Sequence, residues 1–140
     1  MSTTRDGDDP DTEPDRDLWL AYDERTLAHR HPDGAFDLGP DDALAVPEPH
    51  PERPARVENV HERLVAAFDP PVERPAPADR ATLERVHEPG YLDDLDARAA
   101  DEPWLTPTTR LTRTALECAA IAAGGAVAAA RRALDAGDLG

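Results

Sequence analysis

Five histidines are the residues of this chain best suited to chemistry, because an imidazole can bind a metal ion or transfer a proton near neutral pH. They are His29, His31, His50, His61 and His87. His29 and His31 are separated by one residue and have Asp33 and Asp37 nearby, which could be drawn as a metal site of imidazoles and carboxylates. In a chain with 30 acidic residues almost every histidine has an aspartate nearby, so the sequence favours an exposed loop pair.

Two other histidines and the single cysteine are predicted to be structural. His61 falls on the apolar stripe of an expected helix, one turn from Val57 and Leu64, where a buried, hydrogen-bonded histidine is favoured over a ligand. His87 is expected at a helix end, where an imidazole can bind carbonyls and interact with the helix dipole. Cys118 lies in an alanine-rich segment, so we expect a small core residue whose thiol pKa is raised by burial, not a nucleophile.

The charge of the chain bears on its partners and compartment. Its 140 residues carry 15 basic side chains, all arginine, against 30 acidic ones, and the formal net charge is −15. Such a surface repels phosphate backbones, so we expect no nucleic-acid partner. The lysine-free acidic composition is typical of halophilic proteins that stay soluble in high salt, although a GC-rich genome would give the same bias. A single cysteine excludes an intrachain disulfide and a thiolate zinc cluster, which favours the cytoplasm.

Common targeting and catalytic motifs are missing from the sequence. Residues 1–17 contain no apolar region of the kind that a signal peptide needs. The long apolar stretch at 118–130 has 13 residues, mostly alanine and glycine, whereas a membrane span needs about 20 strongly apolar ones. We therefore expect no transmembrane helix. The sequence contains no Gly-rich phosphate loop and no Gly-x-Ser-x-Gly, His-Glu-x-x-His or Cys-x-x-Cys motif. It therefore gives no support for nucleotide binding or for serine-hydrolase, zincin or thioredoxin chemistry.

The elements that must position these residues follow from the hydrophobic pattern. Residues 1–16 are predicted to be a disordered acidic tail, and residues 17–140 to be the folded part. The apolar run Leu18–Tyr22 predicts a buried strand, and the proline-rich stretch 29–54 predicts a long loop. A helix is expected over 54–68, because its apolar residues follow helical spacing and a proline suits the first turn.

The second half of the chain is predicted to be mostly helical. A short extended piece around Val72 precedes Asp79, a plausible cap for a first short helix, and a second short helix carries Tyr91, Leu92 and Leu95. Thr106 and the proline after it read as the N-cap and first residue of a long helix that ends near Gly137. Its paired glycines, 124 and 125, are expected to let a neighbouring backbone approach closely.

The segment 50–56, His-Pro-Glu-Arg-Pro-Ala-Arg, resembles the histone deacetylase superfamily, which includes acetylpolyamine amidohydrolases and acetoin-utilisation deacetylases. Those proteins carry a His-Pro-Glu-x-Pro-x-Arg loop that leads into a helix. Three more segments resemble the family in the same order along the chain. They are Tyr22–Arg25 after the first strand, the leucine, valine and histidine pattern of 83–92, and the Ala-Gly helix at 119–125. The resemblance covers about residues 17–137.

The resemblance implies an α/β fold, the arginase/deacetylase-like three-layer arrangement with a parallel sheet between helices. It also implies hydrolysis of acetyl-lysine or acetylated amines by zinc-bound water. Carried over, His50, Pro51 and Glu52 would lie at the rim of the substrate tunnel, and Arg56 would line an inner cavity where its guanidinium could bind acetate. The alternative for Arg56 is a surface ion pair with Glu52 or Glu58. In some members of the family an acidic residue in the loop before the long helix contacts the substrate backbone. Asp101 or Glu102 could correspond to it, but we assign this role to neither.

The zinc ligands, general-base histidines and transition-state tyrosine of that family follow the long Ala-Gly helix, and family members are more than twice as long as this chain. We therefore expect an incomplete, N-terminal portion of the fold, with no catalytic or metal-binding residue of its own and no zinc bound in isolation. A complementary C-terminal catalytic half is the expected partner, and an acetylated protein or small amine the expected substrate of the whole. The alternatives are a non-catalytic acidic interaction module and a catalytic half that a separate gene encodes.

Overall fold

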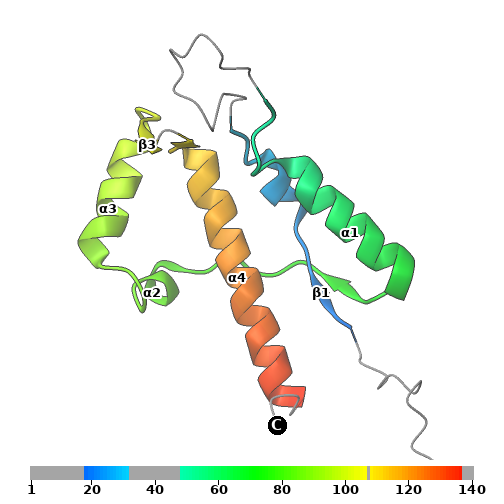
Figure 1. Cartoon of the computed structure of the whole chain (residues 1–140). Helices are drawn as coiled ribbons and strands as arrows, with labels where there is room; N and C mark the ends of the chain where they lie inside the picture. Colours follow the sequence, from blue (N-terminus) through cyan, green and yellow to red (C-terminus); the bar gives the residue numbers. More distant parts are fainter. Residues whose placement is uncertain (1–17, 32–47, 107, 137–140) are drawn as a thin grey trace, which may run out of the picture.

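The computed structural model of the chain describes residues 18–31, 48–106 and 108–136. The predicted acidic tail at 1–16 and most of the predicted long loop lie outside these ranges. Figure 1 shows the long helix α4 running through the middle of the molecule, with α1 on one side and α2 and α3 on the other. In chain order the elements are β1 (Leu20–Ala21), the 3₁₀ helix η1 (Glu24–Ala28), α1 (Pro54–Phe68), β2 (Val72–Glu73), α2 (Arg80–Leu83), α3 (Pro89–Arg98), β3 (Trp104–Thr106), β4 (Thr109–Arg110) and α4 (Arg113–Ala136).

β1 and β2 form a two-stranded parallel sheet, and α1 lies between them in the sequence. Leu20 is opposite Val72 and Ala21 opposite Glu73. This β-α-β connection is the unit of α/β folds, so the expected fold class is confirmed. β1 is half-buried and not buried as predicted. It is also shorter than the predicted strand over Leu18–Tyr22. The reason is its partner: prolines at 70, 71 and 75 flank β2, and a proline has no N–H to extend the ladder.

α1 begins and ends where the sequence predicts. Pro54 occupies the first turn, where its missing N–H removes no helical hydrogen bond. Asp69 ends the helix in the left-handed conformation, with φ of 44°, and its N–H donates to the carbonyl of Val65 at 2.9 Å. The predicted cap of α2 is also confirmed, because a side-chain oxygen of Asp79 accepts a 2.8 Å hydrogen bond from the backbone N–H of Thr82.

The predicted start of the long helix at Thr106 is wrong. α4 begins at Arg113, and the hydroxyl of Thr112 accepts a 2.9 Å hydrogen bond from the N–H of Ala115, as an N-cap side chain does. Before it, β3 and β4 form an antiparallel hairpin, and the N–H of Leu111 donates to the carbonyl of Pro103 at 2.9 Å. Leu111 is only 3% exposed. Burial of this leucine therefore favours the hairpin over one more turn and a half of helix.

α4 packs against η1 and β1, and its buried residues are Cys118, Ile121 and Gly124. The connection from β2 to α2 also crosses this helix, and the N–H of Ala78 donates to the carbonyl of Ala120 at 2.8 Å. A Cβ atom at Gly124 would collide with the carbonyl oxygen of Ala76. The expectation that these glycines allow close backbone approach is thus confirmed at Gly124.

By length and composition alone, α4 is long and apolar enough to cross a membrane, with a mean hydropathy of 1.2 over its most apolar window. One such helix is weak evidence, because the core helices of soluble proteins pass the same test. The contacts of α4 with η1 and β1 give its apolar face a role in packing. The predicted absence of a membrane span stays a prediction.

The small core and the large negative charge together predict a salt-dependent fold. In the described ranges the buried apolar residues are Ala99, Leu111, Cys118 and Ile121, and several large apolar side chains such as Phe68 and Leu134 are exposed. Repulsion within a chain of net charge −15 opposes compaction and is screened over about 3 Å at 1 M salt against about 30 Å at 0.01 M. We expect the chain to be partly helical and loosely packed in dilute buffer and to gain helix in molar KCl.

Circular dichroism and thermal melts at 10 mM and 1 M KCl check this expectation. NaCl should act like KCl, because screening depends on ionic strength and not on the identity of the salt. A sharp cooperative melt with the same midpoint at both salt concentrations would contradict it.

Candidate functional site

The loop 48–53, which leads into α1, is held to the β3–β4 turn by His50. This imidazole is 7% exposed. Its Nδ1 accepts a 2.9 Å hydrogen bond from the N–H of Glu52, and its Nε2 lies 3.0 Å from the carbonyl oxygen of Thr108. These partners assign the proton to Nε2, which donates to Thr108. In the described chain, His50 therefore joins two segments that are 58 residues apart.

The other predicted site residues of this region are exposed. Pro51 and Glu52 lie on the surface, and the guanidinium of Arg56 pairs with the carboxylate of Glu52 at 2.5 Å, one helical turn away. This is the ion pair that the alternative reading of Arg56 predicts. A pair of this kind contributes about 0.5 kcal/mol or less. The tunnel-rim role of His50, Pro51 and Glu52 and the inner-cavity role of Arg56 stay predictions.

Tyr22, the first residue of the Tyr-Asp-Glu-Arg segment, stacks on His61 of α1. The ring centroids are 3.9 Å apart and the planes are inclined by 18°. His61 is half-buried and stacked on Tyr22, so it lies at the margin of the core, whereas the sequence favoured a fully buried histidine. Burial, and then the negative charge of Glu58, raises the pKa of Tyr22, so its hydroxyl stays protonated at neutral pH.

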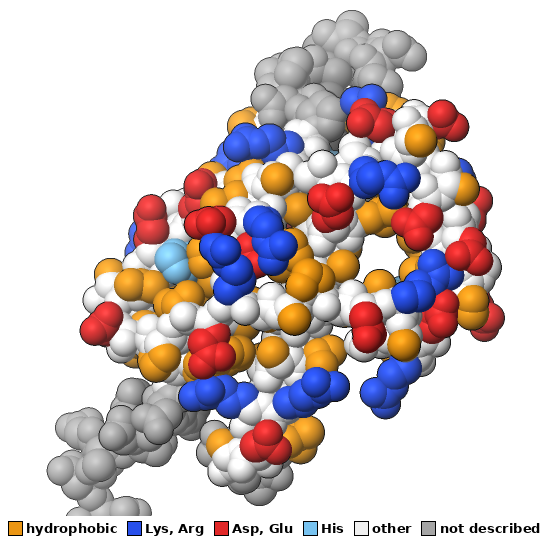
Figure 2. All heavy atoms as spheres, turned by 180° about the vertical axis from the view of Figure 1, so that it is seen from behind, with side chains coloured by type: hydrophobic (Ala, Val, Ile, Leu, Met, Phe, Trp, Pro, Cys, Tyr) orange, Lys and Arg blue, Asp and Glu red, His pale blue; other side chains and the backbone are white. Residues whose placement is uncertain are grey.

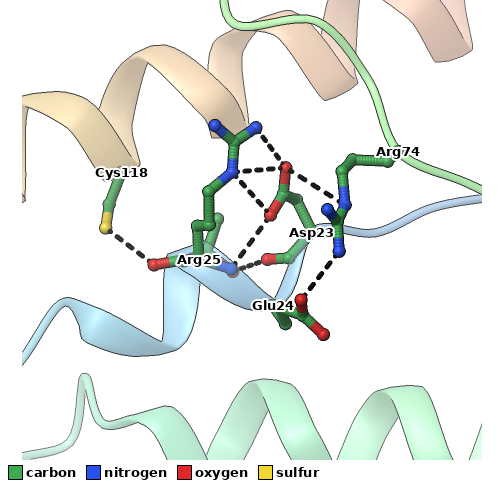
Figure 3. A network of polar contacts seen from close by, with 6 residues as sticks. Asp23, Glu24, Arg25, Arg74 and Cys118 are labelled. Atoms are coloured by element: carbon green, nitrogen blue, oxygen red, sulfur yellow. Dashed lines mark hydrogen bonds and ion pairs between the residues drawn. The ribbon is translucent and has the colours of Figure 1, made fainter.

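Asp23 is the centre of a polar network that the sequence analysis missed (Figure 3). Its side chain is fully buried and accepts hydrogen bonds from the backbone N–H and the guanidinium of Arg25, at 2.9 Å and at 2.5–3.0 Å. The guanidinium of Arg74 lies 3.8 Å away and also pairs with Glu24. The hydrogen bonds from Arg25 are the main reason that the pKa of Asp23 is lowered to about 2. An aspartate directly before a helical turn, with arginine two residues later, is the signal that could have found this cap.

Cys118 lies beside this network on the inner face of α4. Its thiol donates a 3.4 Å hydrogen bond to the carbonyl oxygen of Arg25 (Figure 3). Burial raises the pKa of the thiol, so Cys118 is protonated at neutral pH and is a weak nucleophile. The prediction of a small core cysteine is confirmed.

The structure brings His50 next to His29 and His31, which the sequence pairs only with each other. We name His29, His31 and His50 the histidine cluster: the ring centroids of His29 and His31 are 4.5 Å apart, and those of His31 and His50 are 4.3 Å apart. Asp33 and Asp37, the carboxylates of the possible metal site considered with His29 and His31, lie outside the described residues. Within the described ranges, no group of three metal-ligating side chains could hold an ion. The last histidine, His87, is exposed, and its ring lies against Tyr91 with centroids 5.7 Å apart.

A cavity of about 550 Å³ lies between α3 and α4, and Figure 2 shows the hollow from behind. Leucines from both sides line it, and charged groups stand around them. Arg80 bridges this region, because its guanidinium pairs with Glu84 at 2.5 Å and with Asp93 at 2.7 Å. Asp101 and Glu102 lie beyond α3, and Glu102 pairs with Arg110 at 2.9 Å. Neither acidic residue faces a described cavity, and their weaker rim prediction gains no support.

Three comparisons with known proteins bear on the family and the fold of this chain. Residues 50–138 match the histone deacetylase domain family. A comparison with curated proteins finds no match. Among solved structures, the chain is similar to one described as the crystal structure of the HDA15 HD domain, with a TM-score of 0.57 and 23% identity. The match covers 76% of this chain and 28% of that one.

At this identity the structural likeness shows the fold, and the fold is the deacetylase-like α/β arrangement that the sequence predicts, present in part. The 28% coverage means that the chain spans less than a third of the matched domain chain. The family match, by contrast, extends from His50 through α4 and takes in more than half of the chain. The chain belongs to the histone deacetylase domain family.

Proposed function

We propose that this chain supplies the N-terminal portion of a zinc-dependent deacetylase that hydrolyses acetyl-lysine or acetylated amines, with the catalytic groups supplied by a complementary C-terminal half. The observation that carries the proposal is the extent of the matches. The family match includes the His-Pro-Glu loop and α4. The match to the similar solved structure covers only 28% of that chain. The short parallel sheet supports it as well. Parallel strands are usually buried in larger sheets with both faces covered, and β1 and β2 have only each other in the described ranges.

Deacetylases of this family are generally zinc-dependent, but the described residues of this chain do not fit a zinc ion. Both ring nitrogens of His50 are engaged by backbone groups, and no three ligating side chains converge. In the proposal, zinc and the water that it activates belong to the complementary half. The isolated chain is then inactive, and no step of the hydrolysis is assigned to its own residues.

The proposed contribution of this chain is positioning and product binding. His50 fixes loop 48–53, so that Pro51 and Glu52 form part of the rim through which an acetylated substrate enters. Arg56, one turn into α1, binds the acetate product through its planar guanidinium, and acetate replaces the carboxylate of Glu52 as its partner. The substrate class, the cytoplasmic location and the C-terminal half are parts of this proposal.

The test is reconstitution with the polypeptide encoded immediately downstream of the chain. The 140-residue chain alone is expected to give no hydrolysis of acetyl-lysine peptides or acetylated diamines above background, and the two polypeptides together with zinc are expected to give turnover. Arg56→Lys keeps the charge but loses the guanidinium, so it should reduce the reconstituted rate. Arg63→Lys, an exposed position on the same helix, should not.

Turnover by the chain alone would contradict the proposal. An unrelated downstream sequence, with no activity on mixing, would instead support the non-catalytic acidic interaction module. No described feature favours that module at present.

A further inference from the structure

The cavity between α3 and α4 is larger than the packing of a folded domain explains. Its volume is about 550 Å³, and Figure 2 shows it open at the surface. Native interiors are close-packed and contain few voids larger than a water molecule. Its lining includes four leucines, Leu83, Leu92, Leu95 and Leu116. The described part of the chain therefore leaves a large apolar space unfilled.

α3, which forms one wall of this cavity, depends on what fills it. The helix has 10 residues, and isolated helices shorter than about 12–15 residues are marginal in water. Leu92 and Leu95 share one face of α3 and line the cavity, with Leu116 of α4 also in the lining. In the described chain, α4 packs on η1 and β1 but has no contact of that extent with α3. A partner between the two helices would bury the apolar face that α3 needs to bury.

The arginines beside the cavity are engaged by protein groups. The guanidinium of Arg80 pairs with the carboxylates of Glu84 and Asp93, at 2.5 Å and 2.7 Å. Nη2 of Arg113 donates a 3.2 Å hydrogen bond to the carbonyl oxygen of Asp96. Small-molecule sites usually combine an apolar lining with a few polar groups that orient the ligand. With both arginines engaged, the lining suits the apolar side chains of a polypeptide better than a small polar ligand.

The extent of the matches indicates which polypeptide supplies those side chains. The residues that line the cavity lie between 80 and 123, inside the family match over 50–138. The match to the similar solved domain covers only 28% of that chain, so most of that chain has no counterpart in the match. A cavity walled by one part of a domain is a natural place for the rest of the domain to pack.

We propose that the cavity between α3 and α4 is a docking site for the complementary C-terminal half, which inserts apolar side chains between Leu92 and Leu116. The inference rests on the proposed function for the identity of the partner and adds the place where the partner binds. Binding gives α3 its tertiary contacts, so the exchange protection of the α3 amides should rise when the two polypeptides are mixed.

The test is the affinity of the 140-residue chain for the polypeptide encoded immediately downstream, measured by isothermal titration calorimetry in 1 M KCl with zinc. Leu92→Gln and Leu116→Gln keep the net charge and the helix propensity but place an amide in the filled cavity. Each is expected to weaken binding by about tenfold or more. Val60→Gln is the control, because Val60 is exposed on α1, across α4 from the cavity (Figure 1). It should change the affinity by less than about twofold.

The outcomes separate this inference from the deacetylase activity. Equal affinities of the wild-type chain and both cavity variants would overturn the docking site, even if the mixture hydrolyses acetyl-lysine. Binding that the cavity variants weaken, without turnover, would support the docking site and contradict only the activity. Dimerisation of the isolated chain that Leu92→Gln abolishes would assign the cavity to a second copy and overturn the proposal. If a cavity variant does not fold, hydrogen exchange of the wild-type chain decides, and unchanged protection of α3 on binding would overturn it.

Discussion

Gly124→Ala is expected to destabilise the chain, and Gly125→Ala, one residue later, to stabilise it. At Gly124 the new methyl group would collide with the carbonyl oxygen of Ala76 and lie 2.9 Å from the nitrogen of Ala78. Both neighbours are backbone atoms and cannot rotate away. Overpacking of this kind costs about 1–3 kcal/mol, and loss of the hydrogen bond between Ala78 and Ala120 adds about 1 kcal/mol.

Gly125 is the matched control, because its nearest neighbours are a side-chain atom of Pro75 at 3.5 Å and the Cβ atom of Ala21 at 3.8 Å. These are ordinary contacts, so alanine there should gain about 0.5–1 kcal/mol of helix stability. Urea unfolding in 1 M KCl, followed by circular dichroism, gives both free energies of unfolding. Similar effects of the two substitutions would show that the crossing of α4 by the segment 76–78 is not the constraint described above.

Asp23→Ala is expected to lower stability more than Asp23→Asn, and both more than Asp94→Asn. Alanine removes the acceptor that caps η1 and leaves the guanidinium of Arg25 without its buried carboxylate. Asparagine keeps an acceptor of similar size, because it is itself a good N-cap, but it loses the charge. Asp94 pairs with Arg98 on the surface of α3 at 3.0 Å, where an ion pair contributes little.

The pH dependence gives an independent reading of Asp23. Its pKa is lowered from 3.8 to about 2 in the folded chain, so its contribution is complete above pH 3.8 and is lost as the pH falls through 2. Acid unfolding of Asp23→Asn should therefore be less steep than that of the wild-type chain between pH 4 and pH 2, when followed by circular dichroism at constant ionic strength. Parallel acid-unfolding curves, or equal urea midpoints for Asp23→Ala and Asp94→Asn, would contradict the central role of this carboxylate.

Local rules predicted the parts of the fold that local interactions determine. Pro54 and Asp79 occupy helix starts in the sequence and in the structure, since a missing N–H and a capping carboxylate act within one turn. The beginning of α4 could not be found in this way. Thr106 and Thr112 are both acceptable caps, and the choice between them depends on burial of Leu111, which involves the distant carbonyl of Pro103.

The candidate site divides along the same line. The family of the loop 48–53 could be identified from its motif, and the match over residues 50–138 bears this out. The contacts of His50 with Thr108 and with His31 depend on how distant segments meet, and no local pattern reports that. The burial of Asp23 likewise depends on segments distant in the sequence, because α4 packs against η1 and Arg74 lies 3.8 Å from the carboxylate of Asp23. The roles of Pro51, Glu52 and Arg56 at a rim or in a cavity stay predictions.

The parallel pairing of β1 with β2 has a consequence for how the chain folds during synthesis. Leu20 cannot pair with Val72 until Val72 has left the ribosome. The hydrogen bond between the carbonyl of Arg25 and the thiol of Cys118 can form only after 93 more residues have been synthesised. At about 5–20 residues per second, the N-terminal strand is without these partners for several seconds. Contacts of such long sequence separation also fold slowly, because the loop must close before any contact forms. Codon changes that slow translation between Leu20 and Val72 should therefore lengthen the time in which β1 lacks its paired strand and is open to proteases and to other strands.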